Sequence, residues 1–173
     1  MARVPIYIVR HAHAVAREAW AGPDRNRPLT ERGVKEARAI AHRFDAAPIG
    51  SPVRKHGTRE LRPTSLMSSH AERCLATLQP LASACRLPIL AVDFLSEGAD
   101  ATELLVQLKN MAAAGGAPVL CSHGDVIWAL VEVLAAAGAS FSELAEVRKG
   151  SILVLETEAG TIESARYIPP AKV

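Results

Sequence analysis

Aromatic residues are scarce in this chain of 173 residues, at 4% of the total, and neither sign of charge dominates. Twenty Lys and Arg residues stand against 18 Asp and Glu, which gives a formal net charge of +2. Because the two signs of charge are nearly balanced, the chain is unlike a general binder of nucleic acid or of a membrane surface. The lack of aromatic side chains also removes the stacking platforms that single strands need. We therefore expect neither nucleic acid nor a membrane as a partner.

Cysteines and long apolar runs are also few. Cys74, Cys85 and Cys121 are odd in number and lie within apolar patterns, which is typical of buried thiols in a reducing compartment. We find neither a leader-like N-terminal segment nor an apolar run long enough to cross a bilayer, and we expect a cytoplasmic protein. With 49% hydrophobic residues, the chain can bury one core, which predicts a single domain over residues 1–173.

The most informative stretch is an apolar run, residues 6–9, that ends in Arg10, His11 and His13. Four successive β-branched or aromatic residues predict a strand buried on both faces, as in the middle of a parallel sheet. In such sheets, ligands bind beyond the carboxyl ends of the strands. Arg10 and His11 therefore stand where a substrate would bind, although they could equally be the solvated exit of a strand.

Strands and helices alternate along the rest of the chain. Further strands are predicted at 66–69, 87–94 and 118–122, helices at 30–44, 70–86, 100–111 and 126–136, a short helix at 140–147, and a terminal hairpin of 151–155 and 161–167. This order predicts an α/β fold, a three-layer α/β/α sandwich around a mostly parallel sheet with a C-terminal β-hairpin.

Three details of this pattern are specific enough to check. The first helix should be capped by Thr30, and its apolar face should consist of Val34, Ala37, Ile40, Ala41 and Phe44. The helix at 126–136 is apolar all round, which predicts deep burial. The basic segment 48–63 precedes the second strand, so we expect a solvated loop at the end of the sheet opposite to the site.

Two more candidate residues follow other strands. His123, with Gly124 and Asp125, ends the strand at 118–122, before a helix whose N-terminus attracts anions. Arg73 lies one turn into the helix after the second strand. A guanidinium fork suits a phosphate better than a metal cation, and a neutral histidine can be a base, a metal ligand or a nucleophile.

Spacing excludes several rival chemistries. No cysteine has an arginine six positions later, as a cysteine-based phosphatase loop requires, and no serine stands in a G-x-S-x-G elbow. A Walker-type glycine loop is absent from the sequence as well.

The remaining strand-end residues lie in motifs that resemble those of the histidine phosphatase superfamily. The motifs are Val9-Arg10-His11-Ala12-His13-Ala14, Arg27-Pro28-Leu29-Thr30-x-x-Gly33-x-x-x-Ala37, Ser68-Ser69-x-x-x-Arg73-Cys74-x-x-Thr77, Ser122-His123-Gly124 and Lys149-Gly150-Ser151. Ala12 stands where many members have glycine, and this form looks most like the small phosphohistidine-phosphatase branch. The segments at 27–29 and 121–124 also look like the phosphatase domain that follows some Nudix hydrolases.

The resemblance implies a metal-independent phosphatase that needs no cofactor. His11 would attack phosphorus to form a covalent phosphohistidine, while Arg10, Arg73 and His123 surround the phosphoryl oxygens. Its partner would be a phosphorylated protein side chain, such as phosphohistidine, or a small phosphorylated metabolite, such as a nucleotide or a sugar phosphate.

The proton donor to the leaving group has two candidates. Glu97 stands where related enzymes carry an acid, whereas Asp125 is a rival that can also begin a helix. Arg17, Trp20 and Arg27 lie in the first loop (residues 17–30) and, with Gly124, could bind the rest of the substrate. That loop could equally be merely solvated, with Trp20 packed on its neighbours.

Two other classes of function stay open. A zinc metallohydrolase could use His11, His13, His123 and Asp125, although Arg10 and Arg73 would place positive charge beside the cation. We expect a structural role for His13. The other class is a non-catalytic module that binds a phosphorylated ligand.

Overall fold

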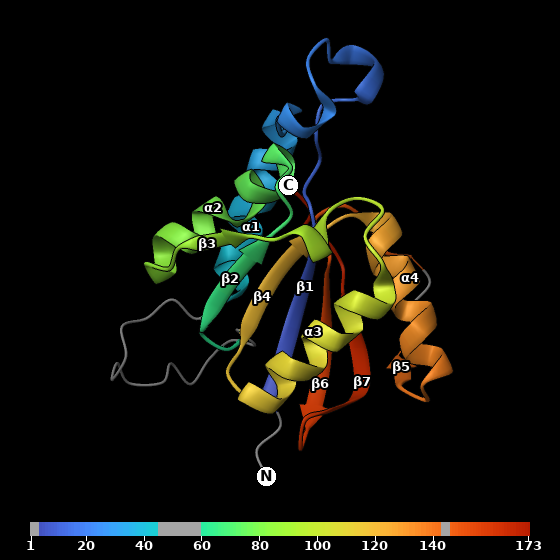
Figure 1. Cartoon of the computed structure of the whole chain (residues 1–173). Coiled ribbons are helices and arrows are strands. Elements are labelled where there is room, and N and C mark those ends of the chain that lie inside the picture. The colour runs from blue at the N-terminus through green and yellow to red at the C-terminus, as the bar shows by residue number, and fades with distance from the viewer. Residues whose placement is uncertain (1–3, 45–59, 143–145) are drawn as a thin grey trace.

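The computed structural model describes residues 4–44, 60–142 and 146–173 (Figure 1). Within them, one seven-stranded sheet has the order β3-β2-β4-β1-β6-β7-β5. The strands are β1 Val4–Arg10, β2 Ser65–Ser68, β3 Ile89–Ala91, β4 Pro118–Ser122, β5 Ser140–Ser142, β6 Ile152–Glu158 and β7 Thr161–Ile168. β6 is antiparallel to both β1 and β7, and the other pairs are parallel. The predicted mostly parallel sheet and terminal hairpin are confirmed.

Four α-helices of the described chain cover the sheet in two layers, which confirms the three-layer sandwich (Figure 1). α1 Glu31–Arg43 and α2 Glu72–Cys85 lie on one face, and α3 Ala101–Ala114 and α4 Gly124–Ala136 on the other. The short 3-10 helices are η1 Arg17–Ala19 and η2 Asp24–Asn26 in the first loop, and η3 Asp93–Leu95 after β3. In the described residues, no helix has the length and apolar character needed to cross a membrane.

β1 is the centre of the core because its side chains alternate between the two layers. Ile6 and Ile8 pack with α3 and α4, whereas Tyr7 and Val9 pack with α1 and α2. All four are at most 1% exposed, as the apolar run predicts. Burying such a side chain stabilises the fold by about 1.5–3 kcal/mol. The strand therefore holds its last residue, Arg10, firmly at the edge of the sheet.

Two predicted elements differ from the observed ones. The helix at 140–147 is wrong, because Ser140–Ser142 forms β5 beside β7, and residues 143–145 lie outside the described part. Pairing with the exposed backbone of β7 outweighs the weak local preference for a helix. The third strand covers only Ile89–Ala91, and η3 follows where the strand was predicted to continue.

Burial also departs from two expectations. α4 is buried on one face only, and Trp128 on its outer face is 37% exposed, because the sheet and α3 reach only one side of the helix. In α1, Thr30 caps the helix and Ala37, Ile40 and Phe44 are buried as predicted, but Val34 is 40% exposed. Glu36 is buried instead, since its carboxylate accepts hydrogen bonds from His13 N and Arg32 Nε. The basic segment 48–63 lies mostly outside the described residues.

Candidate active site

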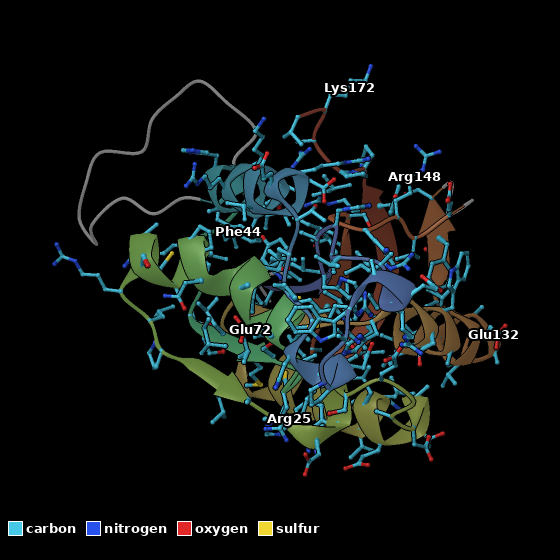
Figure 2. The ribbon with its side chains drawn as sticks, turned by 90° about the horizontal axis from the view of Figure 1, so that it is seen from above. Arg25, Phe44, Glu72, Glu132, Arg148 and Lys172 are labelled. Atoms are coloured by element: carbon cyan, nitrogen blue, oxygen red, sulfur yellow. The ribbon has the colours of Figure 1, made fainter. Side chains whose placement is uncertain are left out.

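The parallel pairing of β1 with β4 brings two strand-end histidines together. Arg10 is opposite Ser122, and His11 N donates to Ser122 O over 3.1 Å. The next residue after Ser122 is His123, whose ring lies 5.4 Å from that of His11, measured between centroids. With Arg10 and Arg73, these residues form what we call the histidine–arginine cluster. The cluster lies at the end of the sheet, under the first loop. Figure 2 shows the molecule from above, with this end of the sheet toward the viewer.

The surroundings of His11 fix which ring nitrogen is free. Nδ1 lies 2.8 Å from Ala12 O, and because a carbonyl oxygen only accepts, Nδ1 carries the hydrogen and Nε2 keeps its lone pair. Burial lowers the pKa of His11 from 6.5 to about 3, and the charges of His123, Arg73 and Arg10 add to this against the opposing bond to Ala12. At neutral pH the ring is therefore uncharged, in the form that a nucleophile requires.

His123 is oriented by three residues of the third motif, Ser69, Arg73 and Cys74. Arg73 Nη2 lies 3.4 Å from His123 Nδ1, and since a guanidinium only donates, Nδ1 is the acceptor. His123 Nε2 then donates to Ser69 Oγ, 2.9 Å away, and Cys74 Sγ lies 3.6 Å from the same nitrogen. The motif Ser68-Ser69-x-x-x-Arg73-Cys74 thus places Arg73 at Nδ1 of the His123 ring and both Ser69 and Cys74 at Nε2.

Arg73 is almost fully buried and touches two carboxylates. Its Nη2 lies 3.0 Å from Glu97 Oε2, and its Nη1 lies 3.1 Å from Asp24 Oδ2 and 3.0 Å from Asp24 O. Asp24 also pairs with Arg17 Nε and Arg27 Nε. Burial alone would raise the pKa of Asp24, but the hydrogen bond from Arg27 and the three arginine charges hold it below its usual value. Asp24 therefore joins the first loop to Arg73.

Sequence reasoning missed Asp24. The only local signal is an acid next to Arg25 and Arg27 in a loop that also holds Arg17, which is a weak pattern by itself. Its contact with Arg73, 49 positions along the chain, appears only in the fold.

Arg10 lies against the N-terminus of α4. Its Nη1 donates to Val147 O over 2.5 Å, and burial lowers the pKa of the guanidinium. A Cβ atom on Gly124 would lie 2.7 Å from Arg10 Cζ, so glycine is needed there to admit the guanidinium. Within the described chain, the buried Nε groups of Arg10 and Arg73 have no hydrogen-bond partner. Each of the two side chains thus keeps an N–H group that could donate a hydrogen bond to an anion.

The three first-loop residues that were predicted to bind substrate differ from one another in their positions and contacts. Arg17 is exposed and lies 3.3 Å from Glu97 Oε1, at the rim of the cluster. Arg27 is 7% exposed and donates to Val15 O over 2.7 Å, so it holds the loop itself together. Trp20 donates to Pro23 O and packs on Gly22. This agrees with the alternative prediction, in which Trp20 packs on its neighbours in the loop.

Of the two candidate acids, Glu97 is in contact with the cluster through Arg73. Asp125 Oδ2 instead accepts a hydrogen bond from Gly98 N over 2.8 Å and so fixes the loop after η3. The cap of α4 is His123, not Asp125.

The ligand set of the zinc hypothesis does not assemble. His13 Nδ1 bonds to Thr30 Oγ1 over 2.9 Å, and Asp125 is held by Gly98, so both point to other partners. Across residues 4–44, 60–142 and 146–173, no three His, Cys, Asp or Glu side chains are grouped as a metal site.

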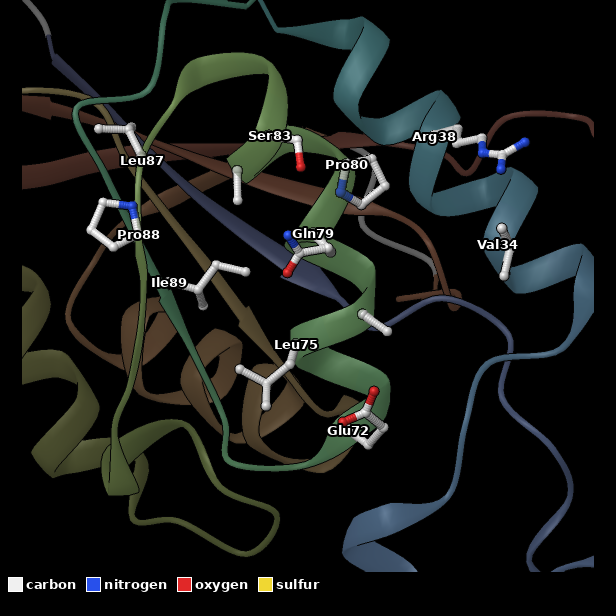
Figure 3. Close-up of a pocket in the computed structure, with 12 residues that line it drawn as sticks. Val34, Arg38, Glu72, Leu75, Gln79, Pro80, Ser83, Leu87, Pro88 and Ile89 are labelled. Atoms are coloured by element: carbon white, nitrogen blue, oxygen red, sulfur yellow. The ribbon is translucent and has the colours of Figure 1, made fainter.

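A groove of about 920 Å³ lies elsewhere, on the outer side of α2 (Figure 3). Figure 3 shows Val34 and Arg38 of α1 on one side, α2 residues such as Leu75 in the middle, and Ile89 of β3 opposite. None of the cluster residues lines it.

Comparison with known proteins places this geometry in context. The model of the histidine phosphatase superfamily (branch 1) matches residues 6–101. An 8-oxo-(d)GTP phosphatase of Mycolicibacterium smegmatis is 31% identical over 168 residues, an alignment that covers 95% of this chain and 48% of the relative. The chain thus spans about half the length of that curated relative.

Two solved structures share the fold. The protein histidine phosphatase SixA complexed with tungstate has a TM-score of 0.67 at 15% identity, covering 96% of this chain and 95% of its own. A mycobacterial glucosyl-3-phosphoglycerate phosphatase has a TM-score of 0.60 at 16% identity, covering 96% and 97%. At these identities the likeness concerns the arrangement of the chain.

Proposed function

Since the chain belongs to the histidine phosphatase superfamily, we propose that it is a metal-independent phosphatase that works through a covalent phosphohistidine on His11. The observation that carries this proposal is the state of His11, which is neutral at pH 7 and bonded at Nδ1, with Nε2 free. Arg10, Arg73 and His123 surround this ring, and the arginine donors suit the charge on a phosphoryl group in transfer.

The reaction has two steps. His11 Nε2 donates its lone pair to phosphorus, and the bond from phosphorus to the leaving oxygen breaks. Water then attacks the phosphohistidine, the bond between phosphorus and Nε2 breaks, and the lone pair returns to His11. A phosphoryl oxygen that reaches Arg73 competes with Asp24 and Glu97 for the guanidinium, whose two Nη groups hold those carboxylates in the free protein.

Glu97 is the proposed proton donor to the leaving oxygen, and it receives a proton from the attacking water in the second step. Its carboxylate touches Arg73, so it lies within reach of a group bound there. Asp125 is the weaker candidate because its carboxylate is already bonded to the backbone of Gly98.

The proposed substrate is a small phosphorylated metabolite, with a nucleotide as the first candidate. A relative of 31% identity over 95% of the chain is named for 8-oxo-(d)GTP, which supports this choice. A sugar phosphate would fit the same cluster. A phosphorylated protein side chain, phosphohistidine in particular, is the second candidate class, supported by Ala12 in the His11 motif and by the short length of the chain.

Trapping the intermediate tests the proposal. A reaction with 32P-labelled substrate, quenched rapidly in base, should leave acid-labile, base-stable label on the protein, and a chelator should not slow turnover. His11→Ala should abolish both label and turnover. His13→Ala is the matched control and should keep the label, because His13 bonds to Thr30 outside the cluster. Full activity of His11→Ala would overturn the proposal.

The acid is tested by comparing leaving groups. Glu97→Gln should slow hydrolysis of an alkyl phosphate by about 10²–10⁴-fold while sparing p-nitrophenyl phosphate, whose leaving group departs as a stable anion. Asp125→Asn should change the rates of hydrolysis of the two substrates by the same factor. The reverse pattern would assign the proton to Asp125.

A further inference from the structure

The loop before β6 is fastened to the centre of the site. Gly150 N donates to Arg10 O over 3.1 Å and to His11 O over 3.2 Å, and Arg10 N donates to Ser151 O over 3.1 Å. Val147 O accepts from the Arg10 guanidinium at the other end of the loop. Lys149 lies between these attachment points, so its backbone has a fixed position next to Arg10 and His11.

Lys149 and its neighbour Arg148 have opposite surroundings. Arg148 is exposed, pairs with Glu146 over 2.8 Å and points away from the molecule in Figure 2. Lys149 is half-buried, and among the residues that the structure describes its ammonium has neither a hydrogen bond nor an ion pair. Burial lowers the pKa of Lys149, Arg10, Arg27 and Arg73 lower it further, and Glu36 opposes them.

Apart from Arg10, whose guanidinium donates to Val147 O, the other cations of the site have carboxylate partners. Arg17, Arg27 and Arg73 each pair with Asp24, and Arg73 also pairs with Glu97. A half-buried ammonium surrounded by other cations is unfavourable unless an anion compensates it. The described side chains do not supply that anion within ion-pair distance, so a bound ligand is the natural source.

The position of Lys149 indicates which part of a ligand it meets. The charges that lower the pKa of His11 are His123, Arg73 and Arg10. Val147 and Gly150, which flank Lys149 in the loop, both bond to Arg10, the first through the guanidinium and the second through Arg10 O. Lys149 therefore lies next to Arg10, at the side of the phosphoryl position, and the charges of Arg10, Arg27 and Arg73 all act on it.

We propose that Lys149 binds a second phosphate of the substrate, adjacent to the phosphoryl group that His11 accepts. This inference rests on the proposed function and gives it a substrate class, a phosphoanhydride such as a nucleoside diphosphate or triphosphate. In the transfer, the bond from His11 Nε2 to the terminal phosphorus forms and the bridging P–O bond breaks. The nucleotide leaves with one phosphate fewer, and its new terminal phosphate stays at Lys149 until it is released.

A charge-removing variant tests this assignment across substrates. Lys149→Met should lower kcat/KM for ADP on the order of 10- to 100-fold, mainly through KM, because the lost contact joins two charged groups. The same variant should change kcat/KM for p-nitrophenyl phosphate, which has one phosphate, by less than about twofold. Lys149→Arg should restore most of the activity on ADP. Lys109→Met on α3 is the matched control, since Lys109 is exposed and lies outside the cluster.

Binding without turnover separates this inference from the proposed function. In the His11→Ala background, calorimetry should show tighter binding of pyrophosphate than of phosphate, and Lys149→Met should remove that preference. Equal losses on ADP and p-nitrophenyl phosphate would place Lys149 on the transferred group and overturn the inference, as would no loss on either. Absence of a phosphohistidine with the pyrophosphate preference intact would instead count against the proposed function alone.

Discussion

His11 is the residue whose protonation is altered most clearly by its surroundings. Burial is the main cause of its low pKa of about 3, and His123, Arg73 and Arg10 lower the pKa further. The unfolded chain binds a proton at His11 below pH 6.5, whereas the folded chain does not until about pH 3. Stability is therefore unaffected by His11 above pH 6.5 and is lost progressively as the pH falls from 6.5 toward 3.

This sign gives a prediction at the residue scale. Between pH 7 and pH 5, wild-type protein should lose about 2 kcal/mol more unfolding free energy than His11→Gln, which has no group to titrate. Urea unfolding at the two pH values measures the difference. In parallel, the NMR signals of the His11 ring should stay those of a neutral imidazole protonated at Nδ1 at pH 5. An ordinary titration of His11 near pH 6.5 would contradict the burial argument.

At the scale of elements, α1 and the segment after β1 fit together through a glycine. A Cβ atom on Gly33 would lie 1.9 Å from His13 O, a backbone atom that can give way only if the whole segment shifts. Thr30 strengthens the same contact, because its hydroxyl accepts from Gly33 N and donates to His13 O. The spacing of Thr30 and Gly33 in the second motif is thus explained by close packing of α1 on the chain that follows His11.

Gly33→Ala should therefore push the segment around His13 away from α1. We expect a loss of about 1–3 kcal/mol in the free energy of unfolding, together with lower turnover. Val34→Ala is the matched control in the same helical turn, and since Val34 is 40% exposed, its stability should change by no more than about 0.5 kcal/mol. Urea unfolding and steady-state kinetics measure both variants. A Gly33→Ala protein as stable as Val34→Ala would remove the packing explanation.

At the scale of the whole molecule, the two hydrophobic clusters share one sheet. Alternate residues of β1, such as Tyr7 and Ile8, belong to opposite clusters, so neither layer of helices keeps its core once the sheet is lost. We therefore predict that the domain unfolds in one cooperative step.

The two tryptophans can test this because they lie in different parts of the molecule. Trp20 lies in the first loop and Trp128 on α4. Urea transitions of Trp20→Phe and Trp128→Phe, followed by the remaining tryptophan, should each have the same midpoint as the circular dichroism signal of the same variant. Separate midpoints for the two probes would mean that the first loop and α4 unfold independently and would contradict a single cooperative step.

The sequence by itself determined the features that depend on short-range pattern. The buried run of β1, the Thr30 cap of α1 and the hairpin of β6 and β7 follow from hydrophobic periodicity and turn chemistry. The turn of that hairpin has Ala159 and Gly160 at positive φ, 50° and 81°. Arg10, His11, Arg73 and His123 could be named as candidates because each stands at or near the end of a predicted strand.

Tertiary structure decided the features that depend on contacts between distant segments. Ser140–Ser142 became a strand because β7 offered an unpaired edge, and Trp128 stayed exposed because none of the described elements covers that side of α4. Arg10 meets Val147 across 137 positions, which brings Lys149 to the site. Asp24 and Glu97 reach Arg73 from two separate loops. Local propensity carries no information about such pairs, because packing of the whole chain determines which charges share one buried space.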